Sequence, residues 1–383
     1  YDIKNMKRQF GQFFTTNADF ILQGFERYVR GKEVADPFAG ERDLMMWAKR
    51  NGAKKVMGFD CDRRYSNEKT VLHRDSINAP QKYKFVCANP PYLHKNKADT
   101  ATKRGFFSGI HARFEDLYQV SIFSMLDSDE GILIVPLNFL CAENAAKIRD
   151  LFFEKFNIVK LNVFSEQVFD DTTYNVISFY FRRKKKNDRK NKVSATIFPQ
   201  KRRMQFTLEK RFDWQWGGEF IQRIRNAENR LGIFRFTENH LRPGGQKIEV
   251  ALQNIKDKKT LYVSGNVKNI LERNVLFLRA IDSKHGKKIQ LEDIRHYGVM
   301  GLIGKSTSRT MAHLIFDNEV SIEQQKELME KFNTGLDRAR EEFSSFFLTN
   351  FRDNNRKRMS FDTAYKFLNY LYEEKNQRQR TLF

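Results

Sequence analysis

The sequence predicts an α/β protein whose first part is a doubly wound sheet of parallel strands. Short apolar runs alternate with helical segments through residues 10–181, and acidic or amide residues follow several of these runs. At residue 182 the composition changes to a stretch rich in Arg and Lys, after which short strands, turns and helical segments are mixed. With 383 residues the chain is long enough for a second domain, which we expect to be basic and of the α+β class.

The first strand of the predicted sheet leads into a loop suited to a ligand. A helix is expected over residues 17–30, with Thr16 or Asn17 as its cap. The strand at residues 33–36 follows and ends in Asp36-Pro37-Phe38-Ala39-Gly40, where the Gly allows the backbone to approach a bound molecule. Ligands of doubly wound sheets bind over the carboxyl ends of the strands, so this loop is a candidate binding site.

Two further acids follow the next strands. A helix is expected over residues 42–51, and the strand at residues 54–59 closes on Asp60. Asp60 lies 24 residues after Asp36, near the spacing at which an acid contacts ribose hydroxyls, and Asp75 follows the third strand. The G-x-G-x-x-G pattern of dinucleotide sites is absent, which favours a nucleoside without a pyrophosphate.

The fourth strand ends in the most informative stretch, Cys87-Ala88-Asn89-Pro90-Pro91-Tyr92. Proline has no N–H and a fixed φ, so this loop is stiff. The side-chain oxygen of Asn89 and the backbone oxygen of Pro90 can face one point together, and Tyr92 can lay its ring beside that point. Two acceptors and a flat face suit an exocyclic amino group on a planar ring such as a nucleobase.

The remaining segments divide the chain into three parts. In the first part we expect helices at residues 114–126 and 142–156, and strands at residues 131–136, 158–164 and 175–181. Residues 182–192 hold eight bases and one acid and are typical of a linker or an edge hairpin. Further helices are expected at residues 321–331, 337–347 and 360–375. The expected domains are 1–185, 186–320 and 321–383, the last being a helical part of the basic region.

Charge is distributed unevenly along the chain. The net charge is +22, but residues 1–181 contain 26 Lys and Arg against 23 Asp and Glu, whereas residues 182–383 contain 43 against 24. A near-neutral part followed by a strongly basic part indicates a polyanionic partner, most often a nucleic acid.

Several classes of protein are disfavoured. No apolar run approaches the roughly 20 residues of a membrane helix, and the first residues lack a signal-peptide pattern. Cys61, Cys87 and Cys141 are odd in number and far apart, and the seven His are scattered, so neither a disulfide framework nor a metal site is expected. We therefore expect a cytoplasmic protein, with native residues before Tyr1 because the sequence does not begin with Met.

In this order the motifs resemble those of amino-group DNA methyltransferases, in particular the γ-class adenine-N6 enzymes of bacterial type II restriction–modification systems. The matching segments are Phe14-Thr15-Thr16, Asp36–Gly40, Asp60, Asp75, Asn89–Tyr92, Gly131–Leu140, and Val168-Phe169 followed by Val176–Ser178. The resemblance covers about residues 10–181. It departs at Arg42, where the family usually has a second Gly after the Asp-Pro loop.

The resemblance implies a Rossmann-like sheet that binds S-adenosylmethionine. In that family the first acid contacts the ammonium group of the cofactor, the second its ribose, the third the adenine amino group, and the opening threonines its carboxylate. Carried over to this sequence, the cofactor-binding residues are Thr15, Thr16, Asp36, Phe38, Gly40, Asp60, Asp75, Ser76, Ile77 and Asn89.

The resemblance also implies the chemistry and the partners. Asn89 and the carbonyl of Pro90 would accept the N6 hydrogens of an adenine flipped out of the duplex, with Tyr92 and Phe169 stacked on the base. The basic second part would be a target recognition domain for double-stranded DNA. A separate cognate restriction endonuclease, a monomeric enzyme and association with the bacterial nucleoid are the corresponding expectations.

Four alternatives remain open at this point. Cytosine-N4 methyltransferases usually have Ser in place of Asn89. Release-factor glutamine methyltransferases and some RNA guanine-N2 methyltransferases share Asn-Pro-Pro-Tyr, but they are not expected to carry so long a basic segment after the catalytic domain, nor the Phe-Thr-Thr opening. A catalytically inactive DNA-binding module is the alternative from another class, although every catalytic motif is present.

Overall fold

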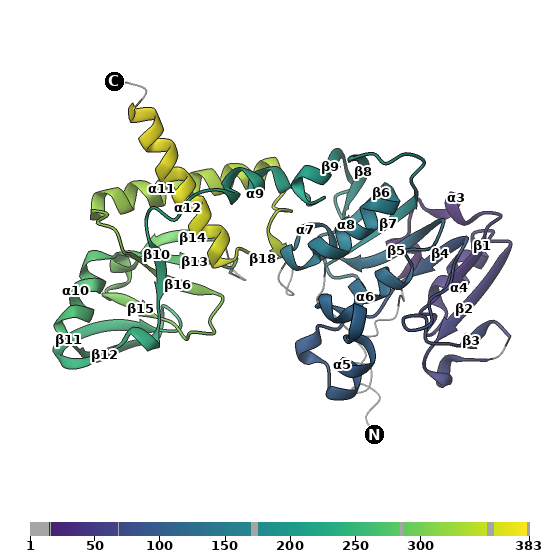
Figure 1. Cartoon of the computed structure of the whole chain (residues 1–383), viewed down its shortest axis with the longest axis horizontal. Coiled ribbons are helices and arrows are strands. Elements are labelled where there is room, and N and C mark those ends of the chain that lie inside the picture. The colour runs from purple at the N-terminus through teal and green to yellow at the C-terminus, as the bar shows by residue number, and fades with distance from the viewer. Residues whose placement is uncertain are drawn as a thin grey trace. The chain divides into compact units, whose positions relative to one another are not determined.

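The chain folds into two compact units, which divide between Trp216 and Gly217 (Figure 1). The computed structural model describes residues 15, 17–67, 69–169, 175–283, 286–350 and 356–380. None of the helices within these ranges has both the length and the apolar character that a membrane crossing requires.

The first unit is built on a nine-stranded sheet with the order β3-β2-β1-β4-β5-β7-β6-β8-β9. The strands are β1 Glu33–Asp36, β2 Lys55–Asp60, β3 Val71–His73, β4 Phe85–Ala88, β5 Glu130–Pro136, β6 Phe156–Phe164, β7 Val176–Arg183, β8 Lys190–Phe198 and β9 Arg202–Glu209. The order reverses between β1 and β4, so the chain crosses over at the point where doubly wound sheets bind ligands.

The sheet is mixed rather than wholly parallel, which corrects the expected arrangement. β7 pairs antiparallel with both β5 and β6, and β9 pairs antiparallel with β8. The connection from β8 to β9 spans only residues 199–201, and so short a connection can join only antiparallel strands. The other seven strands run in one direction, so their carboxyl ends share one edge of the sheet.

Short helices connect and flank these strands. They are α2 Ala18–Ile21, α3 Glu26–Val29, α4 Asp43–Arg50, α5 Thr100–Phe106, α6 Leu117–Ser124, α7 Asn138–Cys141 and α8 Ala146–Lys155. The single helix expected over residues 17–30 is wrong, because α2 and α3 are separate. Gly24 lies between them with φ +80°, a left-handed conformation that a continuous α-helix excludes.

The first unit extends beyond the domain boundary expected at residue 185. β8 pairs in parallel with β6, and the alternation of buried and exposed residues along β8 fits a strand with one face on the core. The basic stretch is therefore part of the nine-stranded sheet. Residues 182–216 contain 13 Lys and Arg against 3 Asp and Glu, whereas residues 217–383 contain 30 against 21. The strongest charge density thus lies in the first unit.

The second unit is of the α+β class. A four-stranded sheet has the order β10-β16-β13-β14, and a three-stranded sheet has the order β12-β11-β15. Its elements are β10 Ile233–Phe236, β11 Pro243–Leu252, β12 Lys258–Val263, β13 Leu276–Arg279, β14 Gln290–Asp293, β15 Gly301–Ile303, β16 Met311–Phe316, β17 Thr349–Asn350, β18 Lys357–Arg358, α9 Gly218–Arg225, α10 Gly265–Arg273, α11 Ile322–Glu342 and α12 Phe361–Arg380.

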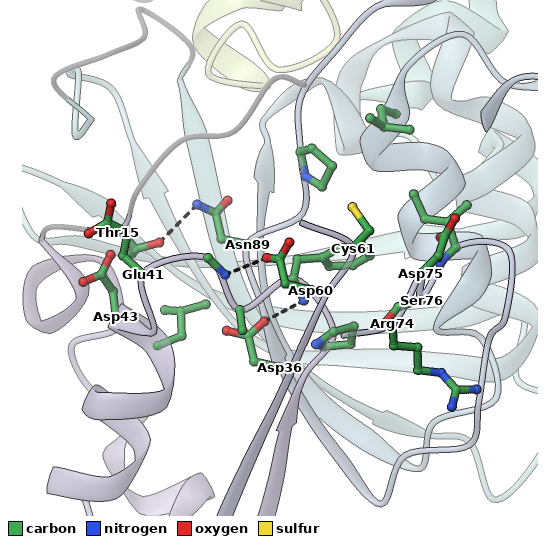
Figure 2. Close-up of a pocket in the computed structure, with 18 of the residues that line it drawn as sticks. Thr15, Asp36, Glu41, Asp43, Asp60, Cys61, Arg74, Asp75, Ser76 and Asn89 are labelled. Carbon is green, nitrogen blue, oxygen red and sulfur yellow. Dashed lines mark hydrogen bonds between the residues drawn. The ribbon is translucent and has the colours of Figure 1, made fainter. Parts of the chain in front are cut away.

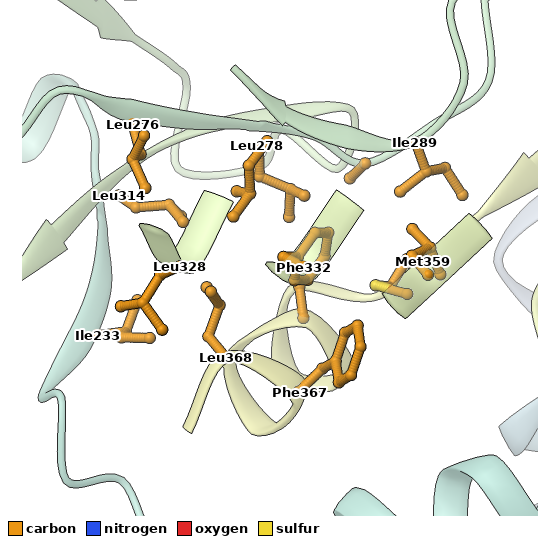
Figure 3. Close-up of a cluster of buried hydrophobic side chains, with 14 of the residues drawn as sticks. Ile233, Leu276, Leu278, Ile289, Leu314, Leu328, Phe332, Met359, Phe367 and Leu368 are labelled. Carbon is orange, nitrogen blue, oxygen red and sulfur yellow. The ribbon is translucent and has the colours of Figure 1, made fainter. Parts of the chain in front are cut away.

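The C-terminal helices of this unit share one core with its four-stranded sheet. Phe332 of α11 and Phe367 of α12 pack with Leu278 of β13 in a single cluster of buried side chains (Figure 3). The helices expected at residues 321–331 and 337–347 are one continuous helix, α11. Residues 321–383 therefore do not form a separate part, because their apolar faces are buried against strands of the preceding segment.

Candidate functional site

The carboxyl ends of β1, β2 and β4 and the segment after β3 meet at one pocket of the first unit (Figure 2). It encloses about 820 Å³ of empty space, its open mouth included. The lining includes nine of the residues predicted to bind a cofactor: Thr15, Asp36, Phe38, Gly40, Asp60, Asp75, Ser76, Ile77 and Asn89. The tenth, Thr16, lies outside the described residues.

Asp36 is the last residue of β1 and is only 2% exposed. One oxygen of its carboxyl accepts the N–H of Phe38 at 3.0 Å. Burial raises the pKa of Asp36 to about 8, the Phe38 N–H opposes this shift, and Asp60 and Asp43 add to it. A cationic group placed beside Asp36 would relieve the cost of burying its charge.

Asp60 is the last residue of β2 and joins two loops of the pocket. Its two carboxyl oxygens accept the N–H of Gly40 at 2.9 Å and the N–H of Asp62 at 2.8 Å. Burial nevertheless raises the pKa of Asp60, against the effect of these two donors. Each oxygen has a second lone pair, so Asp60 can also accept from a ligand hydroxyl.

The loop between Asp36 and α4 ends in a left-handed residue. Arg42, at the position where the resembled family has Gly, adopts the left-handed conformation with φ +72°. A non-glycine residue there costs about 1 kcal/mol of backbone strain.

The segment after β3 is folded around Asp75. One oxygen of the carboxyl accepts the N–H of Ile77 at 3.0 Å and that of Asn78 at 3.1 Å, and the other accepts the side-chain amide of Asn78 at 2.8 Å. These bonds form an Asx turn. The turn sets Ile77, which is 5% exposed, into the wall of the pocket, where an apolar side chain can pack on a planar ring.

Asn89 follows β4, and its carboxamide is held at both ends. Its nitrogen donates to the hydroxyl of Thr15 at 3.1 Å, as Figure 2 shows, and its oxygen accepts from the hydroxyl of Tyr92 at 2.6 Å. Burial raises the pKa of Tyr92 well above its usual value, so this hydroxyl keeps its proton. The pattern fixes which end of the amide is the acceptor.

Three of the four predicted catalytic residues do not line the pocket. Tyr92 is 4% exposed and packs edge-to-face on Tyr118, Phe169 is 1% exposed, and Pro90 is buried. Pro91 rather than Pro90 contributes to the wall. The rings of Tyr92 and Phe169 are thus packed in the core in this structure, and their stacking on a base stays a prediction.

Several pocket residues escaped the sequence analysis. They include Glu41, Asp43, Arg74, Phe106 and Leu117. Asp43 begins α4, and its pKa is raised by burial despite a hydrogen bond from the backbone of Thr15. An acid directly after the Asp-Pro loop was a usable signal for Asp43. Phe106 and Leu117 come from segments beyond the fourth strand, so only the tertiary structure brings them to the site.

Comparison with protein families gives one match. Residues 36–169 match the model of the Eco57I restriction-modification methylase. The matched segment runs from the first pocket acid to Phe169 and contains the Asn89–Tyr92 motif. The resemblance to restriction–modification methylases drawn from the motifs is thereby confirmed, and the γ class stays a prediction. Comparison with curated proteins gives no match.

Comparison with solved structures gives remote similarities. The type IIL restriction-modification enzyme MmeI in complex with DNA is 10% identical, with a TM-score of 0.53 over 96% of this chain and 69% of that one. The type IIG restriction endonuclease BpuSI is 11% identical, with a TM-score of 0.46 over 92% of this chain and 58% of that one. The modification subunit of a putative type I restriction enzyme from Vibrio vulnificus YJ016 is 12% identical, with a TM-score of 0.37.

These similarities concern the fold. The alignment with the Vibrio vulnificus subunit covers 50% of this chain and 48% of the subunit, so the chain spans about half the length of that protein. The match to MmeI extends over both units of the chain, with a TM-score above 0.5.

Proposed function

We propose that this chain, with its restriction-modification methylase segment at residues 36–169, is a site-specific DNA methyltransferase that transfers a methyl group from S-adenosylmethionine to N6 of adenine. The observation that carries the proposal is the position of Asn89 beside a pocket whose walls hold Asp36, Asp60 and Asp75. A polar amide at the mouth of an acidic, partly apolar pocket suits the transfer of a group between a nucleoside-type donor and an amine.

The residues of the pocket fit the proposed cofactor. Asp36, Asp43 and Asp60 are carboxyl groups with raised pKa values, so the pocket favours a ligand that brings positive charge. Phe38 and Ile77 supply apolar surface for a planar ring, and Asp60 can accept from ribose hydroxyls. When bound, S-adenosylmethionine would supply an electrophilic methyl group on a sulfonium.

Asn89 is the residue that we assign to the amine. The N6 lone pair of adenine is delocalised into the ring and is a weak nucleophile. Hydrogen bonds from both N6 hydrogens, to the Asn89 oxygen and the Pro90 carbonyl, favour a tetrahedral nitrogen whose lone pair is free. The bond from Tyr92 to Asn89 supports this assignment, because it directs the acceptor oxygen of the amide.

Double-stranded DNA is the proposed substrate, and protection of host DNA from a cognate endonuclease is the proposed role. A base inside a duplex cannot reach a pocket of this kind, so it must be flipped out. The basic character of residues 182–383 supports a polyanionic substrate. Adenine is preferred over cytosine because position 89 is Asn rather than Ser.

Sequencing with modified-base detection tests the proposal. DNA from cells that express the chain should carry N6-methyladenine in one sequence context, and DNA from cells that express Asn89→Ala should not. N4-methylcytosine in the first sample would replace adenine by cytosine as the target. The absence of any modified base, with the purified protein folded and DNA-binding, would overturn the methyltransferase proposal.

A further inference from the structure

A cationic hollow lies on the first unit, away from the proposed active site. It is formed by α3, β6 and the β8–β9 hairpin, and it opens over about 1170 Å³ of empty space, its open side included. Its described lining contains Arg27, Lys160 and Arg203, together with hydroxyl and amide side chains, and no Asp or Glu.

The three cations of this hollow come from distant segments of the chain. Lys160 of β6 pairs in register with Ser194 of β8, and Arg203 of β9 pairs with Thr196 of β8. Arg27 lies on α3. The sheet therefore brings the three charges together, although more than 170 residues separate the first from the last.

The charges of the hollow are balanced by few acids. Lys160 donates to the carbonyl of Gly24 at 2.7 Å, and Arg27 donates to the hydroxyl of Tyr28 at 2.7 Å, and both of these acceptors are neutral. Burial lowers the pKa of Lys160, Arg27 and Arg203 lower it further, and Glu26 opposes these effects. A bound anion would relieve this repulsion.

Further basic residues lie between the hollow and the edge of the sheet at which Asn89 follows β4. Lys201, Arg202 and Arg203 are exposed at the β8–β9 turn. β8 runs in the same direction as β4, because β4 and β5 are parallel, β7 is antiparallel to both β5 and β6, and β6 and β8 are parallel. The turn after β8 and Asn89 after β4 thus lie at the same edge.

The distance along that edge matches the scale of a DNA duplex. Four strand-to-strand steps separate β4 from β8, which corresponds to about 19 Å. Successive phosphates of one DNA strand are about 3.4 Å apart along the helix axis, so the turn can meet the backbone about six base pairs from the base presented to Asn89.

We propose that Arg27, Lys160 and Arg203, with Lys201 and Arg202 of the β8–β9 turn, bind the phosphodiester backbone of DNA that flanks the target base. The inference rests on the proposed function for the identity of the DNA as substrate. It assigns to the methyltransferase-like sheet a backbone contact of its own, in addition to any made by the second unit.

A matched pair of charge variants tests this assignment. One variant replaces Lys201, Arg202 and Arg203 by Gln, and the control replaces Lys185, Lys186 and Arg189 by Gln. The control residues are also exposed, but they lie between β7 and β8 at the opposite edge of the sheet. Both variants lose three positive charges, and equal thermal transitions would show that both are folded.

Binding of a fluorescein-labelled 30-base-pair DNA duplex is then measured over a series of salt concentrations. The slope of log K against log salt should fall by about two to three in the first variant, near one for each lost phosphate contact, and should stay unchanged in the control. Affinity at 0.15 M salt should fall at least about tenfold in the first variant alone. Equal losses in both variants, or no loss in either, would overturn the assignment.

Two further measurements distinguish DNA from other anions. In the first, inorganic phosphate and chloride compete with the duplex at equal ionic strength. If phosphate displaced more duplex than chloride from the wild type, and not from the first variant, the site would bind free phosphate and the backbone assignment would be overturned. Tighter binding of an RNA duplex with the same difference between variants would overturn the DNA assignment. Methyl transfer is assayed separately. An inactive wild type would refute the proposed function, but the comparison of DNA binding between the two variants could still be interpreted.

Discussion

The hydroxyl of Tyr92 donates to the side-chain oxygen of Asn89 at 2.6 Å, and it also lies 3.0 Å from the carbonyl of Ile134 in β5. The amide proposed to receive the substrate amine is therefore oriented by a buried phenol that is itself placed by the neighbouring strand. Thr15 holds the other end of the same amide. Tyr92 is thus a positioning residue in this structure, whatever its ring does when DNA is bound.

Tyr92→Phe removes this orienting bond and keeps the ring. We expect kcat for methyl transfer to fall by about tenfold, the value of one lost neutral hydrogen bond, with little change in cofactor affinity. Single-turnover transfer and calorimetric titration with the cofactor measure the two quantities. A role in stacking alone would leave Tyr92→Phe fully active, whereas Asn89→Ala, the reference variant, should abolish transfer in either case.

Asp36→Asn should stabilise the cofactor-free protein at alkaline pH. The pKa of Asp36 is about 8 in the folded chain and near 3.8 in the unfolded chain, so the folded state holds a proton that the unfolded state has lost between these values. The free energy of unfolding therefore falls as the pH rises from about 4 to 8. Asn retains the acceptor for Phe38 and carries no charge, so urea denaturation should show a higher midpoint for the variant at pH 8 and similar midpoints below about pH 4.

The same substitution should remove the attraction for a cationic ligand. A cation beside Asp36 favours the charged carboxylate, so binding of the cofactor by the wild type should release a proton near pH 7 and tighten as the pH rises toward 8. Calorimetry in two buffers of different ionisation enthalpy measures that proton. Undiminished affinity in Asp36→Asn, or binding without proton release, would contradict the assigned contact.

Arg42→Gly should stabilise the fold without loss of cofactor binding. The left-handed conformation of Arg42 costs about 1 kcal/mol, and Gly adopts it without strain, although Gly also raises the entropy of the unfolded chain. The net gain should be a fraction of 1 kcal/mol. Arg42→Ala is the control, because it removes the charge and keeps the strain. Equal stability changes in the two variants would show that the side chain, not the backbone, decides the effect.

The site was more predictable than the domain boundaries. The carboxyl ends of parallel strands meet at one edge, so Asp36, Asp60 and Asn89 could be brought together from strand order alone. The burial of Tyr92 could not, because its contact with Ile134 depends on the register of β4 and β5. That register is set by the packing of the whole sheet rather than by local sequence.

Two errors of the sequence reading have identifiable physical causes. The charges of residues 182–192 suggested a linker or an edge hairpin, and the linker is wrong. Val193, Ala195 and Ile197 alternate with polar residues, which is the period of a strand, and β8 and β9 form an antiparallel pair at the end of the sheet. The second error is the gap between the helices expected at residues 321–331 and 337–347, which contains Gly335. In the structure Gly335 lies inside α11, where an added Cβ would come within 2.9 Å of the ring of Phe367. Gly335 thus permits close packing of α11 against α12 instead of ending the helix.

Arg149→Met should destabilise the first unit. Arg149 of α8 is 0% exposed and donates to the carbonyls of Phe139 at 3.2 Å, Ala142 at 2.6 Å and Asp213 at 3.1 Å. Burial lowers the pKa of its guanidinium to about 10, which still leaves it charged at neutral pH. Met fills part of the volume but leaves three carbonyl groups without this donor, so the free energy of unfolding should fall by about 2–4 kcal/mol in urea denaturation.

The loss of stability in Arg149→Met should be concentrated near the β8–β9 hairpin. The bond to Asp213 ties the segment after β9 to α7 and α8, so Arg149→Met should also expose the β8–β9 hairpin to faster hydrogen exchange. Arg149→Lys is the informative partner, because it keeps the charge but offers fewer, differently placed donors. If the two variants lost equal stability, the three directed hydrogen bonds rather than the buried charge would be the stabilising feature, because only Arg149→Lys keeps the charge. Slower exchange of β4 than of β9 in both variants would place the weakened contacts at the hairpin edge of the sheet.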